Sequence, residues 1–363
     1  MLSNSFNRRL MGPVFACGLV ALFVGCSSSK DGVGGGDRQY VTLGTAPVGG
    51  AFAPVGNAIA SVANEFKGDQ DWKVQAQGTK GSQQNIRMLD KGEIQLGMSN
   101  SAISYHAARG IGTWDKEYEI RAVVTLAPNV GLFITKKNSG IETLADLKDK
   151  RVTVGPAGAG FEMFLGPLLT ANGVNYGDGE PAFTPMNETY SAAVQLLGDD
   201  NADAAFMGGA VPTPAVTQAC TSYDISFIPY DESVRQQLID KYEFYQSATI
   251  PAKNKDGKPT YKGLEADFPA LNVGSMQLIT SADVDEELIY QLTKTIWENR
   301  KEIAKQHKAA NAINEKNAAR YTGTEFHPGA IRFYQEIGIW PEETSEAAPD
   351  DSSTAAVPAG TAE

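Results

Sequence analysis

The chain is poor in the residues that metal sites and disulfide bonds need. Its 363 residues include 3 histidines and 3 cysteines, and no histidine has a cysteine or carboxylate beside it at metal-ligand spacing. Cys17 and Cys26 lie near the N-terminus, so Cys220 has no disulfide partner in the main body of the chain. We therefore expect no bound metal and a small, buried, apolar role for Cys220.

Sequence motifs for nucleotide binding and nucleophilic catalysis are also missing. There is no Gly-x-Ser-x-Gly, no glycine loop ends in Gly-Lys-Ser or Gly-Lys-Thr, and Gly155–Gly160 has the order GxxGxG rather than GxGxxG. Basic stretches with interleaved aromatic residues are absent, which argues against nucleic acid as a partner. Asp199, Asp200 and Asp203 fit a solvated turn better than a calcium loop. We expect neither a cofactor nor an enzyme.

The chain also lacks an apolar run long enough for a comfortable membrane helix, and its short N-terminal apolar run indicates export. Residues Met11–Val24 are too short, and too interrupted by proline and glycine, for a comfortable membrane helix, and Arg8 and Arg9 precede them. The run ends in Leu22-Phe23-Val24-Gly25-Cys26, which resembles a bacterial lipobox with Phe23 in place of the usual leucine. We expect a lipoprotein signal peptide at 1–25, a lipidated Cys26, and a flexible tether at 26–38; plain secretion is the alternative.

The C-terminal stretch lacks positive charge. The formal net charge of the chain is -12, and residues 341–363 contain no lysine or arginine. Their acidic residues are Glu342, Glu343, Glu346, Asp350, Asp351 and Glu363, which account for half of that net charge. Few apolar residues accompany them, so we expect an acidic disordered tail at 341–363.

What is present between these ends is an alternation of short apolar strands and helices, typical of an α/β protein with a largely parallel sheet. The stretch Val41–Gly56 passes from a strand through a glycine-rich loop into a helix. Three further loops repeat this design, so that four loops in all join a strand end to a helix start through small residues: Thr45–Gly50, Gly78–Ser82, Gly158–Phe161 and Gly208–Pro212. Unpaired N–H groups at helix starts favour an anion.

The placement of these loops predicts two domains with a cleft between them. We expect domain I at 39–128 and 249–340 and domain II at 129–248, so that each domain supplies two of the four loops. Ser247–Ala270 is expected to be an irregular return segment, and Val273–Thr280 a strand. The longest helix is expected at Asp283–His307, and a final helix from Pro328 to Gly338.

Six phrases, in order and nearly spanning 40–340, resemble a known family. They are Val41–Gly50, Gly81–Leu89, Leu144–Gly160, Val211–Val216, Ala248–Ala252 and His327–Ala330. Together they resemble the solute receptors of tripartite ATP-independent periplasmic (TRAP) transporters, TAXI class. The resemblance implies a two-domain α/β fold of the type II periplasmic-binding-protein kind that closes on one small organic acid. It also implies a permease partner in the membrane, commonly a fused one, and a location in the periplasm or at the cell surface.

The resemblance, carried over position by position, implies a set of ligand-binding residues in the cleft. From the first predicted domain these are Thr45, Gly49, Gly50, Phe52, Ser82, Gln83, Asn85, Asn100 and Ser101. From the second they are Gly158, Ala159, Gly160, Phe161, Glu162, Met207, Gly208 and Gly209.

Departures from the family pattern suggest the ligand. Phe52-Ala53 stands where two tyrosines are common, Phe161 ends a phrase that usually ends in threonine, and Asn100-Ser101-Ala102 replaces a Gln-x-Asp. The loss of an acid and of hydroxyls weakens the hold on an ammonium group first. We therefore expect a keto acid or dicarboxylate ahead of glutamate; Lys80 is either a counter-charge or a solvent-facing loop residue.

Two other functions remain open at this point. A sensory receptor of the same fold would signal through a membrane partner instead of delivering a solute. An enzyme acting on a small acid is disfavoured because the four loops contain no nucleophile paired with a base.

Overall fold

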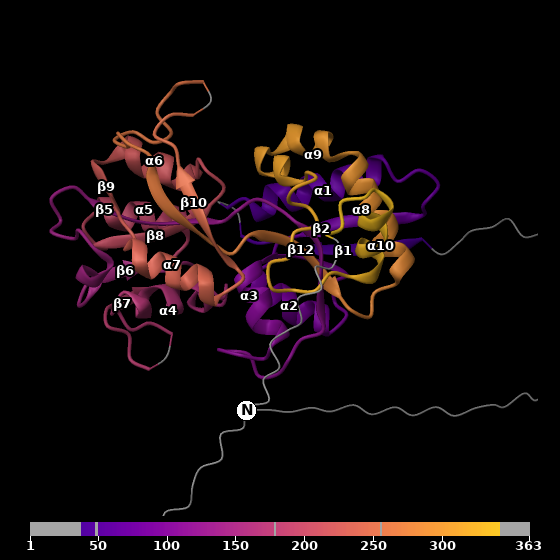
Figure 1. The fold of residues 1–363 in the computed structure, drawn as a ribbon, viewed down its shortest axis with the longest axis horizontal. Coiled ribbons are helices and arrows are strands. Elements are labelled where there is room, and N and C mark those ends of the chain that lie inside the picture. The colour runs from indigo at the N-terminus through magenta and orange to yellow at the C-terminus, as the bar shows by residue number, and fades with distance from the viewer. Residues whose placement is uncertain (1–37, 48–49, 178, 255, 342–363) are drawn as a thin grey trace, which may run out of the picture. The chain divides into compact units, whose positions relative to one another are not determined.

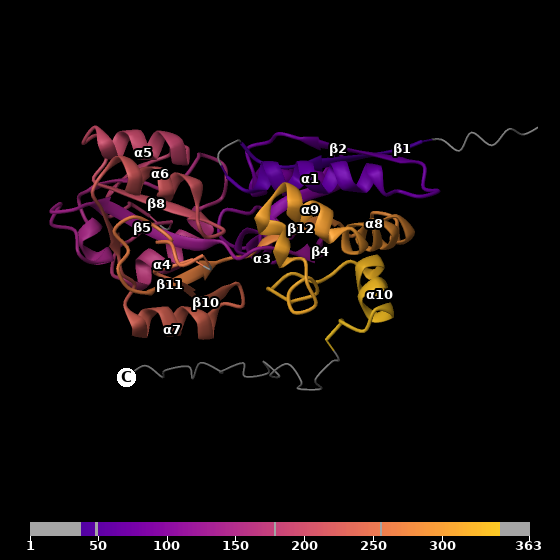
Figure 2. The same ribbon diagram turned by 90° about the horizontal axis from the view of Figure 1, so that it is seen from above.

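Two mixed β-sheets organise the residues that the structure describes. The structure, a computed structural model, describes residues 38–47, 50–177, 179–254 and 256–341. From Arg38 onward these residues belong to one compact unit that contains both sheets (Figures 1 and 2). The expected signal peptide, Cys26, nearly all of the tether, Gly49 and all but the first residue of the acidic tail lie outside the described residues. Across the described part, no helix is long and apolar enough to cross a bilayer.

The first sheet has five strands in the order β2-β1-β3-β12-β4. Its strands are β1 (Gln39–Gly44), β2 (Trp72–Gln77), β3 (Leu96–Asn100), β4 (Ile120–Thr125) and β12 (Met276–Ser281). The first three run parallel, and β12 runs antiparallel to both β3 and β4. All five residues of β3 are buried, as expected of a central strand that is covered on both faces.

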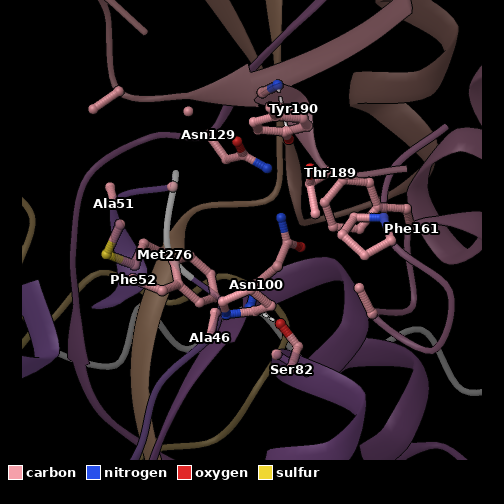
Figure 3. A pocket seen from close by; sticks show the side chains of 18 of the residues that line it. Ala46, Ala51, Phe52, Ser82, Asn100, Asn129, Phe161, Thr189, Tyr190 and Met276 are labelled. Atoms are coloured by element: carbon pink, nitrogen blue, oxygen red, sulfur yellow. Dashed lines mark hydrogen bonds between the residues drawn. The ribbon is translucent and has the colours of Figure 1, made fainter. Parts of the chain in front are cut away.

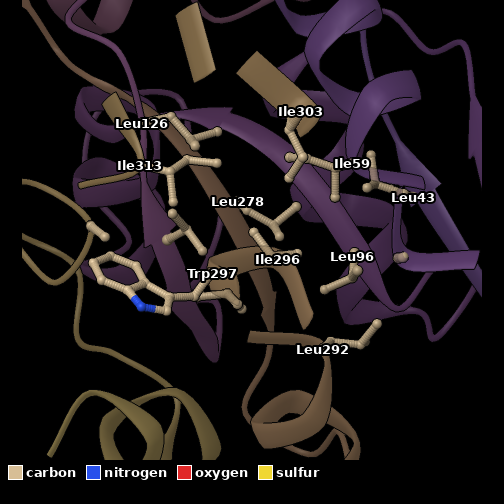
Figure 4. Packing of buried hydrophobic residues seen from close by; sticks show 14 of the residues in the cluster. Leu43, Ile59, Leu96, Leu126, Leu278, Leu292, Ile296, Trp297, Ile303 and Ile313 are labelled. Carbon is tan, nitrogen blue, oxygen red and sulfur yellow. The ribbon is translucent and has the colours of Figure 1, made fainter. Parts of the chain in front are cut away.

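Helices cover this sheet on both faces. One face packs on α1 (Phe52–Glu65), α8 (Glu286–Glu298), α9 (Arg300–Gln306) and α10 (Pro328–Glu336), whose apolar stripes join the strands in one core. Figure 4 shows part of this core, with Leu43 and Leu278 from strands beside Ile59 and Ile296 from helices. The other face packs on α2 (Ser82–Asp90) and α3 (Ser101–Ala108). The carboxyl ends of the parallel strands are thereby left open for loops.

The second sheet has seven strands, six of them in the order β10-β11-β5-β8-β6-β7, with β9 also paired to β5. Its strands are β5 (Val130–Lys136), β6 (Arg151–Thr153), β7 (Thr184–Met186), β8 (Ala204–Gly209), β9 (Ile225–Ile228), β10 (Tyr245–Ile250) and β11 (Phe268–Val273). Its helices are α4 (Glu162–Ala171), α5 (Tyr190–Gly198), α6 (Pro214–Ser222) and α7 (Glu232–Lys241). Helices α5 and α6 pack in one core, where Cys220 is buried with its thiol pKa raised by burial to about 11.

One apolar core is shared by both sheets. It joins α2 and α3 from the first sheet to α4 and to strands β5, β6 and β8 of the second. Gly160 lies against Ile103 of α3, and the indole N–H of Trp114 lies 3.1 Å from the sulfur of Met163 in α4. The two sheets are therefore held together by packing as well as by the connecting chain.

The chain crosses between the sheets twice. The first crossing lies between β4 and β5, at residues 126–129. The expected irregular segment Ser247–Ala270 instead contains most of β10 and the start of β11, which pair in the second sheet. The second crossing therefore falls at Gly274 and Ser275, inside the single strand expected over Val273–Thr280. The predicted domain boundaries stay a prediction.

The long helix expected at Asp283–His307 is two helices. Asp285 caps α8 by accepting a hydrogen bond from the N–H of Leu288 at 2.8 Å. Asn299 then ends α8 and begins α9, with a backbone outside the α region (φ -107, ψ 19). Its side chain donates back to the carbonyl of Thr295 at 2.9 Å. This local competition for helix hydrogen bonds explains a break that apolar periodicity does not reveal.

Candidate functional site

A pocket lies where loops from the two sheets meet, at the carboxyl ends of the parallel strands (Figure 3). It holds about 840 Å³ of empty space, including solvent at its mouth. Its lining residues are Ala46, Pro47, Gly50, Ala51, Phe52, Lys80, Gly81, Ser82, Asn100, Ala127, Pro128, Asn129, Pro156, Ala159, Phe161, Thr189, Tyr190, Gly208, Gly209, Ala210 and Met276. The carboxyl edge of an open α/β sheet is where such folds place their ligands.

The N-termini of five helices reach this pocket. The residues that precede α1, α2, α3, α4 and α5 all line it, and they are Ala51, Gly81, Asn100, Phe161 and Thr189. At α1, α2 and α4 no side chain caps the helix start. Helix starts carry unpaired N–H groups and a partial positive charge, and an anion satisfies both.

Three hydroxyl groups of the lining serve the backbone as hydrogen-bond acceptors. Ser82 Oγ accepts from the N–H of Asn100 at 3.0 Å, Thr189 Oγ1 from that of Ala192 at 3.3 Å, and Tyr190 Oη from that of Gly208 at 2.9 Å. A hydroxyl that accepts from the backbone keeps its own hydrogen to donate. Burial also raises the pKa of the Tyr190 phenol, so this group stays protonated. The pocket is thus rich in donors.

The amides of the lining differ in how far they are already used. The Asn100 side chain accepts from the N–H of Ala102 at 2.8 Å and donates to the carbonyls of Val273 and Gly274. Its donors are therefore committed to the chain around the second crossing, and its oxygen is committed to the start of α3. The Asn129 side chain makes no hydrogen bond to any described residue, and Figure 3 shows its amide directed into the open space. Asn129 has the free amide.

The described residues of the lining carry one formal charge, which is positive. Lys80 is the one charged side chain among the described residues that line the pocket, and it forms no ion pair with a described residue. No Asp, Glu, His or Cys occurs in this lining. Within the described ranges, no group of such residues is placed to hold a metal ion.

The second-sheet side of the pocket depends on one glycine. Gly155 has φ +92, and a Cβ added there would lie 2.2 Å from the ring of Phe161. This missing side chain lets the ring lie over the β6–α4 loop, where it also contacts Phe164 and Phe206. The Phe161 ring is half-buried and forms an apolar wall of the pocket.

Eight of the residues expected to bind ligand line the pocket. They are Gly50, Phe52, Ser82, Asn100, Ala159, Phe161, Gly208 and Gly209. Lys80 also lines it. The four predicted loops are therefore brought together in space, and each contributes to one lining.

Other expected residues lie behind the lining and hold its loops. Thr45 Oγ1 donates to the carbonyl of Gln77 at 3.0 Å, and Asn85 Nδ2 donates to the carbonyls of Thr45 and Met98 at 2.7 and 2.8 Å. Ser101 is buried, and its N–H donates to the carbonyl of Ser275 at 2.8 Å. These residues therefore support the carboxyl edge of the first sheet without lining the pocket.

The remaining expected residues belong to the second sheet or to the surface. Met207 alternates with Gly208 along β8 and is buried in the core under α5 and α6. Gly158 is exposed, and Gly160 packs on α3. Burial raises the carboxyl pKa of Glu162, which follows the lining residue Phe161 but does not line the pocket. Gln83 donates to Thr113 Oγ1 at 3.3 Å outside the pocket.

The sequence reading missed several lining residues. Asn129 ends the first crossing and directly precedes β5, so the rule of polar residues at the carboxyl end of a strand, which identified Asn100, does not point to it. Thr189 and Tyr190 begin α5, whose preceding strand β7 has only three residues and a weak apolar pattern. Met276 follows the second crossing, whose position was not anticipated.

Behind the pocket, a polar cluster joins the two crossings. We call it the crossover network: Gln246, Asn272, Ser275 and Arg320. Asn272 accepts from the backbone N–H of Asn129 at 3.0 Å and donates to Gln246 at 3.2 Å and to Ser275 Oγ at 3.0 Å. Arg320 donates to Gln246 and, at 2.9 Å, to Ser275 Oγ. Burial lowers the pKa of this guanidinium.

Strand order, helix layers and pocket position together define the periplasmic-binding-protein fold. Among solved structures, a binding-protein component of an ABC phosphonate transporter from Pseudomonas aeruginosa superposes with a TM-score of 0.51 and 11% identity, covering 84% of this chain and 87% of that one. PhnD1 from Prochlorococcus marinus in complex with methylphosphonate gives a TM-score of 0.50 at 11% identity, covering 84% and 100%. The expectation of an α/β fold of this class is confirmed. The expectation of a largely parallel sheet is wrong, because both sheets are mixed.

The sequence itself is matched by a family model over most of its length. The model described as the NMT1-like family covers residues 43–338. The chain therefore belongs to the NMT1-like family.

Proposed function

We propose that this protein is an extracytoplasmic solute receptor that binds a small organic acid in the pocket. The observation that carries the proposal is the lining, where five helix starts and Lys80 meet without an acidic side chain among the described residues. Several partial positive charges and one full charge stabilise an anion together. The absence of a carboxylate, imidazole or thiol in that lining also favours binding over acid–base or nucleophilic catalysis.

The chemistry of the donors favours a keto acid or dicarboxylate over glutamate. An α-ammonium group needs acceptors, whereas Ser82, Thr189 and Tyr190 each have a hydrogen to donate and Lys80 is cationic. A carboxylate and a ketone have acceptors alone, so they match these donors. An unmatched polar group in a desolvated site costs about 1 to 3 kcal/mol.

A thermal-shift screen of the full-length chain, purified in mild detergent, tests this function. The ligands are 2-oxo acids, dicarboxylates, glutamate, and methylphosphonate as a different small oxyanion. A ligand at a hundred times its Kd adds roughly 2.7 kcal/mol to the free energy of unfolding. Stabilisation by 2-oxo acids or dicarboxylates but not glutamate supports the proposal. Stabilisation by glutamate alone contradicts the ligand class, and a shift with none of these anions contradicts the anion receptor.

The proposed place of action is the periplasm or the cell surface. It rests on the export signal at 1–25 and on lipidation of Cys26, which would keep the receptor near a membrane. Replacing Cys26 with Ser should release the protein into the soluble fraction after washing without detergent. Retention of this variant in the membrane fraction would contradict lipid anchoring.

The proposed partner is an integral-membrane permease of the TRAP type, probed as follows. Both the TAXI-class resemblance and the two predicted domains suit a receptor that closes on its ligand and is then recognised by the permease. Ligand uptake into proteoliposomes that contain the permease of the same genome should need this receptor. Ligand-dependent binding to a signalling protein, with no effect on uptake, would instead identify a sensory receptor.

A further inference from the structure

The pocket has one positive charge and mostly apolar walls, and this combination restricts the ligand further. We propose that the ligand is a 2-oxo monocarboxylate with an apolar side chain of several carbons, and not a dicarboxylate. This inference rests on the proposed function, because it narrows the class of acid that the same pocket binds.

The charge of the lining accounts for one carboxylate. Lys80 is the single cation among the described lining residues. It lies on the first-sheet side of the pocket, as do the starts of α1 at Ala51 and of α2 at Gly81. A first carboxylate that lies near Lys80 and these helix starts is therefore matched. A second carboxylate meets no further cationic side chain in this lining, and the helix starts on the second-sheet side offer it partial charges alone.

The walls provide an apolar surface for the rest of the ligand. Figure 3 shows Phe52 and Met276 on one side of the open space and Phe161 on another. Eight alanines and prolines also line the pocket: Ala46, Pro47, Ala51, Ala127, Pro128, Pro156, Ala159 and Ala210. Such apolar side chains make favourable contacts with the carbon atoms of a ligand, and they provide neither a hydrogen bond nor a charge for a second carboxylate.

The free amide of Asn129 accounts for the oxo group. Its side chain has no hydrogen bond to a described residue and is directed into the space, so its NH₂ can donate to a carbonyl oxygen. The hydroxyls of Ser82 and Tyr190 add further donors from opposite sheets. One carboxylate, one ketone and an apolar side chain therefore match the lining group by group.

A pair of ligands of nearly equal shape separates the two possibilities. In 5-methyl-2-oxohexanoate an isopropyl group stands where 2-oxoglutarate has its second carboxylate. Titration calorimetry on the full-length chain should give a Kd for 5-methyl-2-oxohexanoate at least about tenfold lower than for 2-oxoglutarate. Equal binding, or tighter binding of 2-oxoglutarate, overturns the inference and leaves an anion receptor in place. Binding of neither ligand, together with no shift from any oxyanion in the screen, overturns both proposals.

Two charge variants sharpen the test. Lys80 is exposed at the edge of the lining, so Lys80→Gln should raise the Kd of 5-methyl-2-oxohexanoate by about two- to fivefold. Lys73→Gln, an equal charge change at an exposed β2 position outside the pocket, should leave this Kd unchanged. Ala210→Lys adds a second cation to the lining and should move the preference toward 2-oxoglutarate. Equal effects of the two lysine variants, or an unchanged preference in a folded Ala210→Lys protein, would contradict a single-charge pocket.

Discussion

The pocket and the crossover network both adjoin the two chain crossings, but they use polar groups differently. In the network, Asn272 and Arg320 direct their side chains at other side chains of the protein. In the pocket, Asn129 and Lys80 have no such partners among the described residues, and the hydroxyls keep hydrogens to donate. A polar group that is satisfied internally stabilises the fold, whereas one left over is available to a ligand. Substitutions in the two regions should therefore separate stability from affinity.

The largest effect is expected at Gly274, in the second crossing. This residue has φ +108, and a Cβ would lie 2.2 Å from Asn100 Oδ1. Gly274→Ala should lower the free energy of unfolding by about 2 to 4 kcal/mol in urea titrations, because strain and a clash act together. Gly68→Ala is the control: its φ is +58 with nothing within 4 Å of the added Cβ, so strain alone of about 1 kcal/mol applies. Equal losses would show that Asn100 moves away freely.

The next effect is expected at Arg320, in the crossover network. Arg320→Gln removes charged donors to Gln246 and Ser275 and should cost about 1 to 3 kcal/mol of stability. Arg332→Gln, which breaks exposed ion pairs with Glu286 and Glu287, should cost less than about 1 kcal/mol. The Kd of the ligand should change little in either variant. A large loss of affinity with normal stability in Arg320→Gln would erase the contrast between the two regions.

A pocket substitution should show the opposite pattern. Asn129→Ala removes a side-chain amide that has no hydrogen bond to a described residue, so the free energy of unfolding should change by less than about 0.5 kcal/mol. The Kd of a 2-oxo acid should rise by roughly five- to tenfold, the value of one hydrogen bond. Urea unfolding and calorimetry of the same preparation measure both quantities. A destabilised protein with unchanged affinity would place Asn129 with the network instead.

The smallest effect is expected from pH. His106 in α3 is buried beside Phe244, its Nδ1 lies 2.7 Å from the carbonyl of Ala102, and burial, with help from the charge of Arg109, lowers its pKa. The unfolded chain then binds the proton more readily, so stability is full above about pH 6.5 and falls as the pH decreases below it. His106→Gln should flatten this part of the pH profile of unfolding, and a profile identical to that of the parent protein would contradict the assignment.

Local sequence patterns predicted the parts of the fold that depend on neighbours in sequence. The Val41–Gly56 stretch and the strand ending in Asn100 are examples, since apolar alternation and glycine placement determine them locally. Local patterns failed where the structure depends on pairing between segments that are far apart in the sequence. Strand β10 pairs with β11, and β11 also pairs with β5. These pairings are not visible in the local sequence, which contains prolines and therefore resembles an irregular linker.

The same distinction explains the site. Loops that join strand ends to helix starts were found from sequence, and their residues meet in the pocket. Which residue of a loop faces inward was harder to predict. Thr45 and Asn85 carry ligand-like side chains, yet they hydrogen-bond to carbonyls that neighbouring strands present, and this requires the sheet register to be known. Asn129 ends the first crossing and Met276 follows the second, and the positions of both crossings are defined by the pairing of distant strands.

The contact between Trp114 and Met163 provides the molecule with an optical signal of its own. Trp72 and Trp297 belong to the core of the first sheet, whereas Trp114 reaches helix α4 beside the second sheet. A movement of one sheet against the other changes the surroundings of the Trp114 indole, whereas the surroundings of Trp72 and Trp297, which lie within the core of the first sheet, change little. Intrinsic fluorescence can therefore report on ligand-dependent motion without a label, and a Trp114→Phe protein should be silent in the same titration.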